Sequence, residues 1–235
     1  MNPASESEAI KLAKASDSAG VVICPPFAFL SSVGKVIKKA TLGAQDLFWQ
    51  ESGPFTGEVS AGELKSEGVK YVIIGHSERR AMGETDEIVA KKVAAAISRS
   101  LTPVICIGEQ RSDHDKSNAQ EVVSRQLRAA LSLIPADIGE QKPTAYIAYE
   151  PVWAISSNQV GDPVAATVEN AISVVNYLKG TIRGAPIKPL FLYGGSVDSV
   201  NLAGFLSAEE IEGALVGSAS LKPAEFKKMA LIAKK

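Results

Sequence analysis

Short apolar runs alternate with longer amphipathic segments along most of this chain. We count seven runs of strand length, at residues 21–24, 41–44, 71–74, 103–107, 146–149, 190–193 and 213–216. Segments with helical periodicity lie between or after them, at 85–99, 117–133, 163–179 and 224–233. Continuous apolar strands that alternate with helices predict a parallel sheet covered by helices.

The start of the chain breaks this alternation, because a helix comes before any strand. Asn2 and Pro3 form a favourable cap and first helical residue, and Ala9, Leu12 and Ala13 follow at helical spacing. A closed barrel of this kind needs eight strands, each followed by its helix. Seven strands therefore indicate either an open doubly wound sheet or a barrel whose first strand is not in this sequence.

Composition and charge are those of one globular domain. The 235 residues are 46% hydrophobic, and the 25 basic and 26 acidic residues leave a formal charge of -1, so no net field attracts nucleic acid. No apolar run is long enough to cross a membrane, and the start does not read as a signal peptide. Cys24 and Cys106 lie in strand-like runs, which is typical of reduced structural thiols. We expect a single domain over residues 1–235, in the cytoplasm.

The run 146–149 ends by presenting one carboxylate, Glu150, directly before the sequence Pro-Val-Trp. A polar loop of small residues follows at 156–162, and Pro163 is well placed to open the next helix. This order predicts a general base beneath a lid.

His76 follows the run 71–74 and stands at a turn into a helix. A helix N-terminus disfavours the imidazolium, so we expect a neutral His76 that donates a hydrogen bond. Taken alone, a histidine at a strand end is equally compatible with a structural role. The other histidine, His114, falls in segment 112–117, which we interpret as a solvated loop.

Small-residue turns follow the last two runs, at 193–197 and 216–220. In a (β/α) barrel, the loops after the last two strands form the usual phosphate site, because their bare amides converge there. Tight turns without a ligand are the alternative. Two such turns in consecutive places favour phosphate binding.

Longer motifs connect these features: G-H-S-E-R-R at 75–80, A-Y-E-P-V-W-A at 148–154, Y-G-G-S-V at 193–197 and L-V-G at 215–217, together with 43–46, 55–60 and C-I-G-E at 106–109. In this order they resemble the triosephosphate isomerase family over nearly the whole chain. The resemblance implies a TIM (β/α)8-type barrel that interconverts dihydroxyacetone phosphate and D-glyceraldehyde 3-phosphate through an enediolate. No cofactor and no metal are expected.

The resemblance also implies a role for each residue. Glu150 matches the base, His76 the neutral electrophile, Ser77 a residue that holds the resting carboxylate, and Glu78 one that pairs with a catalytic lysine. The phosphate shell would comprise Ser156, Ser196, Gly194, Gly195, Gly217 and Ser218. The water-excluding lid would comprise Pro151, Val152, Trp153, Ala154 and Ile155. Phe55, Thr56 and Gly57 match a loop that enters a neighbouring subunit, which implies a homodimer; without the resemblance this loop would be an ordinary surface turn.

The chain departs from the family at three places. Ser-Ser-Asn-Gln at 156–159 replaces a glycine-rich run, which predicts altered lid kinetics rather than lost binding. Ser218 replaces a second glycine and keeps its N–H unless that position needs positive φ. The family's Asn-x-Lys, at the end of its first strand, would fall just before residue 1, and Lys11 and Lys14 lie on the opening helix instead.

Losing one preorganised donor commonly costs about a hundred- to a thousandfold in turnover. Three explanations stay open: a start further upstream, a genuinely short product with an open barrel, or a second polypeptide that supplies the strand. We expect a triosephosphate isomerase, impaired in the chain as given. A catalytically silent phosphate-binding dimer or scaffold and a different phosphate-binding barrel enzyme are the alternatives.

Overall fold

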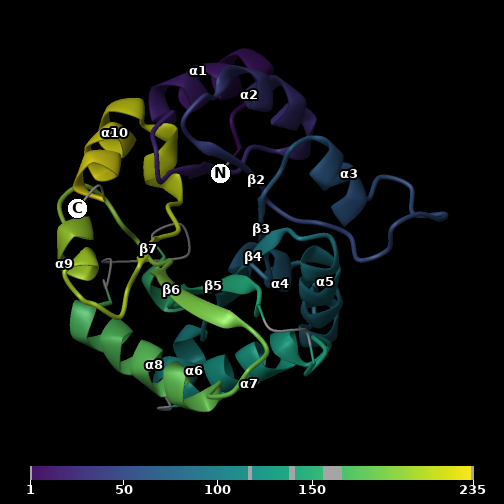
Figure 1. The fold of residues 1–235 in the computed structure, drawn as a ribbon. Coiled ribbons are helices and arrows are strands. Elements are labelled where there is room, and N and C mark those ends of the chain that lie inside the picture. Colours follow the sequence, from purple (N-terminus) through teal and green to yellow (C-terminus); the bar gives the residue numbers. More distant parts are fainter. Residues whose placement is uncertain (1, 116–117, 138–140, 156–165, 234–235) are drawn as a thin grey trace.

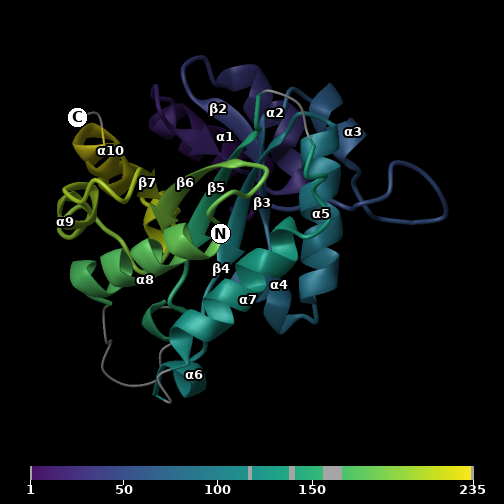
Figure 2. The same ribbon diagram turned by 60° about the horizontal axis from the view of Figure 1, so that its bottom comes forward.

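Parallel strands form one curved sheet, and helices surround it (Figures 1 and 2). The structure is a computed structural model that describes residues 2–115, 118–137, 141–155 and 166–233. Its seven strands in these ranges are β1 (Val22–Ile23), β2 (Thr41–Ala44), β3 (Tyr71–Ile74), β4 (Thr102–Ile107), β5 (Thr144–Tyr149), β6 (Lys188–Tyr193) and β7 (Gly213–Ala214). Every one overlaps a predicted run.

The strands pair in sequential order, β1 to β7, and every pair is parallel. A doubly wound sheet reverses its strand order at a switch point, so the sequential order excludes that alternative. Within the described residues β1 and β7 are not paired with each other, whereas helices α1 and α10 are in contact outside them. The ring of helices therefore closes around a barrel sheet that is open between β1 and β7 (Figure 1).

The two faces of the sheet carry different parts of the core. Ile105 and Ile107 of β4 and Ile147 of β5 point outward into the main cluster beneath the helices. Their neighbours Val104, Cys106 and Ala148 point inward and form a smaller cluster within the curve of the sheet. Because both faces are covered, the strands read as continuous apolar runs, which is why the sequence located them well.

The helices are α1 (Glu6–Ser16), α2 (Leu30–Val36), α3 (Ala61–Ser66), α4 (Ser77–Ala81), α5 (Asp86–Ser98), α6 (Arg111–Asp115), α7 (Ala119–Leu131), α8 (Val168–Thr181), α9 (Leu202–Leu206) and α10 (Pro223–Ile232). The predicted start of the opening helix is wrong, since Ser5 rather than Asn2 is its cap and accepts a hydrogen bond from the Glu8 amide at 3.3 Å. None of these described helices is long and apolar enough to cross a membrane.

Two further predictions need correction. The helix expected from Pro163 begins at Val168, because Thr167 caps it by accepting a bond from the Asn170 amide at 3.2 Å; residues 163–165 lie outside the described ranges. The segment interpreted as a solvated loop overlaps the short helix α6, and its His114 packs on Trp153.

Candidate active site

Glu150 and His76 lie in contact at the carboxyl ends of their strands. Glu150 follows β5 directly, and His76 comes two residues after β3. His76 Nε2 lies 3.1 Å from Glu150 Oε1, and the Ser77 backbone N–H donates to Glu150 Oε2 at 3.1 Å. Ser77 thus holds the carboxylate through its amide, because its buried hydroxyl has no hydrogen-bond partner among the residues that the structure describes.

His76 is the N-cap of α4, and its ring faces the helix end as the sequence predicted. The Glu78 amide donates to His76 Nδ1 at 3.2 Å, so Nδ1 presents a lone pair and the ring proton is assigned to Nε2. Burial lowers the pKa of His76, but the hydrogen bond and charge of Glu150 raise it more, and the net shift is upward. This differs from the expectation based on the helix N-terminus alone, because the helix amide competes with a carboxylate in direct contact with the ring.

Backbone groups pack closely around Glu150, which is 2% exposed. A Cβ on Gly108 would lie 1.7 Å from the Glu150 carbonyl oxygen, and one on Gly194 would lie 2.8 Å from Glu150 Cγ. The side-chain amide of Gln126 holds Gly108 in place: its Oε1 accepts from the Gly108 N–H at 2.8 Å and its Nε2 donates to the Gly108 carbonyl at 3.1 Å. Only glycine leaves room for Glu150 at both positions.

The predicted phosphate turns follow β6 and β7, at the same end of the sheet. The Gly194 amide donates to the Tyr149 carbonyl at 2.8 Å. It is therefore not free to bind a phosphate, which a member of the expected phosphate shell would have to do. Gly217 and Ser218 are exposed and begin the short 3-10 helix η4 (Ser218–Leu221). Within the described ranges Ser100 is the one non-glycine residue with positive φ, so Ser218 is compatible with its backbone.

The remaining members of the expected shell are placed less completely. Gly195 is buried behind Tyr193, and the Ser196 carbonyl accepts from the Asn201 side-chain amide at 3.1 Å. Ser156 lies outside the described residues.

The start of the expected lid, Pro151 to Ile155, contains the 3-10 helix η2 (Val152–Ala154), whose residues are all buried. The Trp153 indole Nε1 donates to Glu109 Oε1 at 2.6 Å, and the Tyr149 hydroxyl donates to the same oxygen at 3.0 Å. Burial raises the pKa of Glu109, which is fully enclosed, even though these two donors lower it. Glu109 therefore anchors the expected lid segment, although in the sequence it was only the last residue of the C-I-G-E motif at 106–109.

His114 packs on Trp153. The two rings lie 4.1 Å apart at an interplanar angle of 32°, and His114 Nδ1 is 3.9 Å from Glu109 Oε1. The sequence did not reveal this contact, because α6 and the lid segment are far apart in the chain.

Glu78 is exposed, and in the described part of the chain its carboxylate lies 3.9 Å from His76 Nδ1, a contact that is an ion pair only when His76 is protonated. The lysine partner implied for it by resemblance is therefore not among the described contacts. No group of three or more His, Cys, Asp or Glu in the described residues could hold a metal ion.

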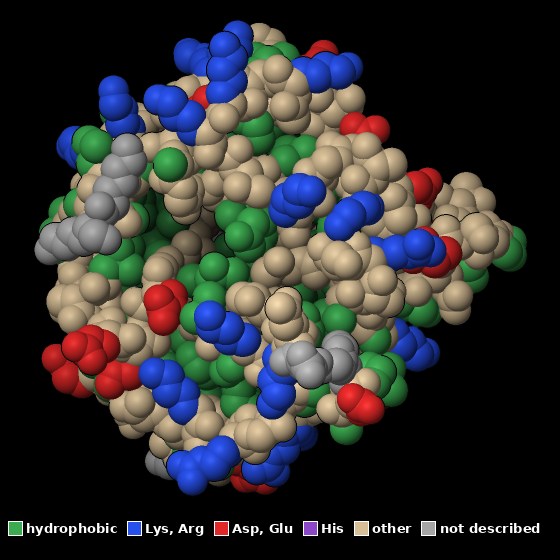
Figure 3. Space-filling model, in the orientation of Figure 1, with side chains coloured by type: hydrophobic (Ala, Val, Ile, Leu, Met, Phe, Trp, Pro, Cys, Tyr) green, Lys and Arg blue, Asp and Glu red, His purple; other side chains and the backbone are tan. Residues whose placement is uncertain are grey.

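The loop between β2 and α3 projects away from the ring of helices (Figures 1 and 2). Phe55 in this loop is 37% exposed and packs on Phe48 with ring centroids 4.8 Å apart; Thr56 and Gly57 beside it are exposed. Figure 3 shows apolar side chains at the end of this projection.

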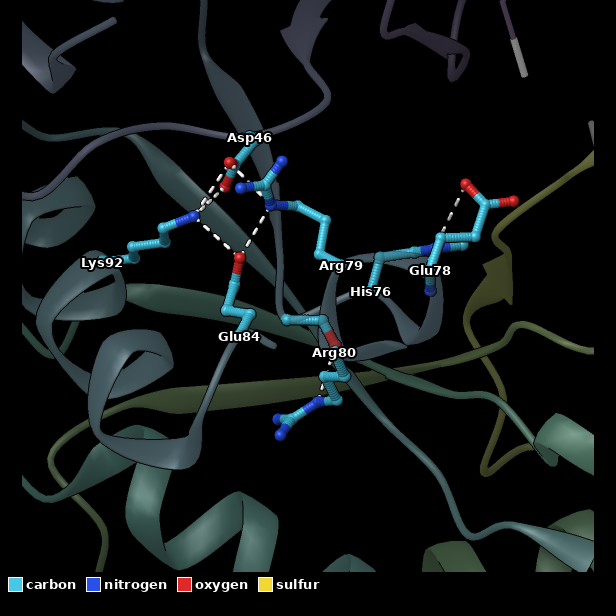
Figure 4. A network of polar contacts seen from close by, with 8 residues as sticks. Asp46, His76, Glu78, Arg79, Arg80, Glu84 and Lys92 are labelled. Carbon is cyan, nitrogen blue, oxygen red and sulfur yellow. Dashed lines mark hydrogen bonds and ion pairs between the residues drawn. The ribbon is translucent and has the colours of Figure 1, made fainter. Parts of the chain in front are cut away.

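A charged cluster lies between this loop and the helix capped by His76 (Figure 4): Asp46, Glu84 and Lys92 are buried in it, and Arg79 is 38% exposed. Lys92 Nζ lies 2.7 and 2.8 Å from the two Asp46 oxygens and 2.9 Å from Glu84 Oε2. Arg79 Nε lies 2.8 Å from Asp46 Oδ2 and 2.7 Å from Glu84 Oε2. The cluster was not predicted, since a lysine on an amphipathic helix normally faces solvent.

A curved parallel sheet ringed by helices, with a buried carboxylate and an imidazole at its carboxyl ends, defines a (β/α) barrel enzyme. A model of the triosephosphate isomerase family matches residues 3–233. The triosephosphate isomerase of Thermoanaerobacter pseudethanolicus is 42% identical over 237 residues, covering 95% of this chain and 92% of that protein. The triosephosphate isomerase of Caldanaerobacter subterraneus subsp. tengcongensis is also 42% identical, covering 95% of this chain and 92% of that protein. That of Roseiflexus castenholzii is 42% identical as well, covering 88% of this chain and 81% of that protein. The chain belongs to the triosephosphate isomerase family and is an isomerase.

Proposed function

We propose that this isomerase interconverts dihydroxyacetone phosphate and D-glyceraldehyde 3-phosphate, with Glu150 as the base and His76 as the electrophile. The contact between Glu150 Oε1 and His76 Nε2 at 3.1 Å carries this proposal. A carboxylate and a ring N–H that meet at one point can act on neighbouring atoms of a small substrate inserted between them. One removes a proton from carbon and the other donates to oxygen.

The proton transfer requires Glu150 to exchange its partners. In the present arrangement its two oxygens face the His76 ring and the Ser77 amide. A bound substrate would take the place of His76 as the neighbour of Glu150, so the carboxylate could move a proton between adjacent carbons. Separation from the carboxylate also removes the main influence that raises the His76 pKa, which favours the neutral, donating ring.

The substrate's phosphate would lie at the turns after β6 and β7. The N-terminus of η4, with the exposed Gly217 and Ser218, supports this placement, together with Gly195 and Ser196. The Trp153 segment, anchored on Glu109, supports a lid that closes over the reacting atoms. Ser156, outside the described residues, stays a member of the proposed phosphate shell. We place the enzyme in the cytoplasm.

A homodimer formed through the Phe55–Gly57 loop is part of the same proposal. The exposed aromatic ring on a projecting loop supports it, because a large apolar side chain gains by entering a partner subunit.

A catalytically silent phosphate-binding dimer or scaffold is the second candidate. It is motivated by the sheet that is open between β1 and β7 in the described residues, and by the absence of a lysine from the described contacts of Glu78.

A steady-state assay on the chain as given separates the two candidates. We expect turnover of glyceraldehyde 3-phosphate to exceed that of Glu150→Ala by at least about a hundredfold. Equal turnover of the two proteins would reject the enzyme and leave the scaffold. Both candidates require a phosphoglycolate anion to raise the melting temperature, and no rise would reject both, together with any other phosphate-binding barrel enzyme.

A further inference from the structure

Arg80 lies directly behind the turn that presents His76. Its Nε donates to the carbonyl of Gly75, the residue before His76, at 2.8 Å, and its Nη1 donates to Asp86 Oδ1 at 2.7 Å. The side chains of Arg80 and Asp86 are only 16% and 14% exposed. One guanidinium thus connects the Gly75 peptide to the first turn of α5.

A second arginine braces this contact from another helix. Arg125 of α7 donates to the other Asp86 oxygen, so Asp86 links α7 to Arg80. Arg80 points away from the charged cluster that contains its neighbour Arg79 (Figure 4). The two adjacent arginines therefore fix α4 on opposite sides, and only Arg80 contacts the backbone that leads into His76.

The turn at Gly75 leaves little freedom in where this carbonyl lies. Gly75 has φ of +74°, a conformation that favours glycine. A Cβ there would lie 3.1 Å from Val89 Cγ2, 3.2 Å from Arg80 Nη2 and 3.3 Å from the Cys106 carbonyl oxygen. Packing surrounds the turn closely, and Arg80 supplies a donor to its carbonyl.

We propose that Arg80 is a positioning residue for the reaction: its guanidinium holds the peptide before His76, so that the His76 ring and the Ser77 amide meet the two oxygens of Glu150. The expected effect on kcat rests on the proposed function, whereas the expected effect on the position of the His76 ring does not. Lysine is a poor substitute, because one ammonium lacks the planar fork that reaches a carbonyl and a carboxylate at once.

The test compares Arg80→Lys with Arg128→Lys in the full chain. Arg128 is exposed on the same helix as Arg125, so its replacement controls for the substitution itself. A displacement of about 1 Å at reacting groups costs up to about a hundredfold in rate, so we expect kcat of Arg80→Lys to fall about 10- to 100-fold. KM should stay within about twofold, because the phosphate turns follow β6 and β7 rather than β3.

A second measurement reads the position of His76 without turnover. The chain has two histidines, His76 and His114, so NMR can follow both imidazole rings through a pH titration. In Arg80→Lys we expect the His76 resonances and titration midpoint to move while the His114 resonances stay in place. In Arg128→Lys we expect the resonances of neither histidine to move.

The outcomes are distinguishable. If the parent protein shows no isomerase turnover, the proposed function fails, and the His76 titration still decides the part assigned to Arg80. An Arg80→Lys protein with unchanged His76 resonances and kcat within twofold of the parent overturns the proposal, as does an equal shift of both histidines. If Arg80→Lys does not fold, Asp86→Asn decides instead: a shift of His76 alone supports the proposal, and no shift overturns it.

Discussion

Replacement of Lys92 by methionine removes the cation at the centre of the charged cluster. Lys92 is 2% exposed, and its ammonium makes three contacts with two carboxylates at 2.7 to 2.9 Å. Breaking a buried ion pair by removing one partner costs about 3–5 kcal/mol, because the other charge stays buried without its counter-charge. Arg79 still contacts Asp46 and Glu84, so we expect the lower part of this range, about 3 kcal/mol, for Lys92→Met.

The pH dependence gives this prediction a second signature. Burial raises the pKa of Glu84, but the hydrogen bonds from Lys92 and Arg79 lower it more, so the net shift is downward from its ordinary 4.5. A lowered pKa in the folded state means that the stabilisation is present above pH 4.5 and is lost as the pH falls through the lowered value. The difference between Lys92→Met and the parent should therefore shrink in acid.

The assay is urea unfolding monitored by circular dichroism, at one protein concentration and at pH values of about 7 and about 4. A loss of about 3 kcal/mol corresponds to a melting temperature lower by about 6–12 °C for a chain of this size. Arg111→Met is the control, since Arg111 and Asp115 form an exposed pair, 58% and 59% accessible, that should contribute little. A loss for Lys92→Met no larger than that of Arg111→Met would refute the reasoning.

Three further predictions concern the site. Burial lowers the pKa of His76, but Glu150 raises it more, so the His76 ring should titrate above 6.5 by NMR and at a lower pH in Glu150→Gln. The stability that this contact contributes should be fully present below pH 6.5 and should be lost as the pH rises through the raised pKa. Trp153→Phe removes the indole donor to buried Glu109, so unfolding in urea should show a loss of about 1–3 kcal/mol, and kcat should fall. Gly108→Ala places a Cβ 1.7 Å from the Glu150 carbonyl, so stability should fall by at least about 3 kcal/mol in the same assay and turnover should be lost.

Each of these has a contradicting result. An unchanged His76 midpoint in Glu150→Gln would show that the contact does not govern its protonation. A Trp153→Phe protein as stable and active as the parent would remove the anchor assigned to Glu109. Gly180→Ala is the control for Gly108→Ala: nothing lies within 4 Å of its Cβ position on α8, so it should be neutral or stabilising by up to about 1 kcal/mol. Equal effects of the two alanines would contradict the steric argument.

Local sequence signals located the strands better than the helix starts. The seven apolar runs were sufficient because residues such as Ile105 and Cys106 are buried on opposite faces of one strand. Helix starts depend on which of several nearby polar residues accepts the first free amide. The predicted segment 85–99 starts at the observed cap Thr85. The caps Ser5 and Thr167, by contrast, lie after the predicted helix starts at Asn2 and Pro163.

The sequence by itself determined a parallel sheet covered by helices and the residues at its strand ends, because parallel strands bring Glu150, His76 and the glycine turns to one edge whatever the details of packing. The barrel was implied by the resemblance, and the strand order of the structure excluded a doubly wound sheet. Only the tertiary structure decided which neighbours these groups have: Glu109 beneath Trp153, Arg80 behind Gly75, and Lys92 between two carboxylates. These contacts join residues on different elements. Their existence depends on the distances and burial that packing creates, which no local periodicity in the chain encodes.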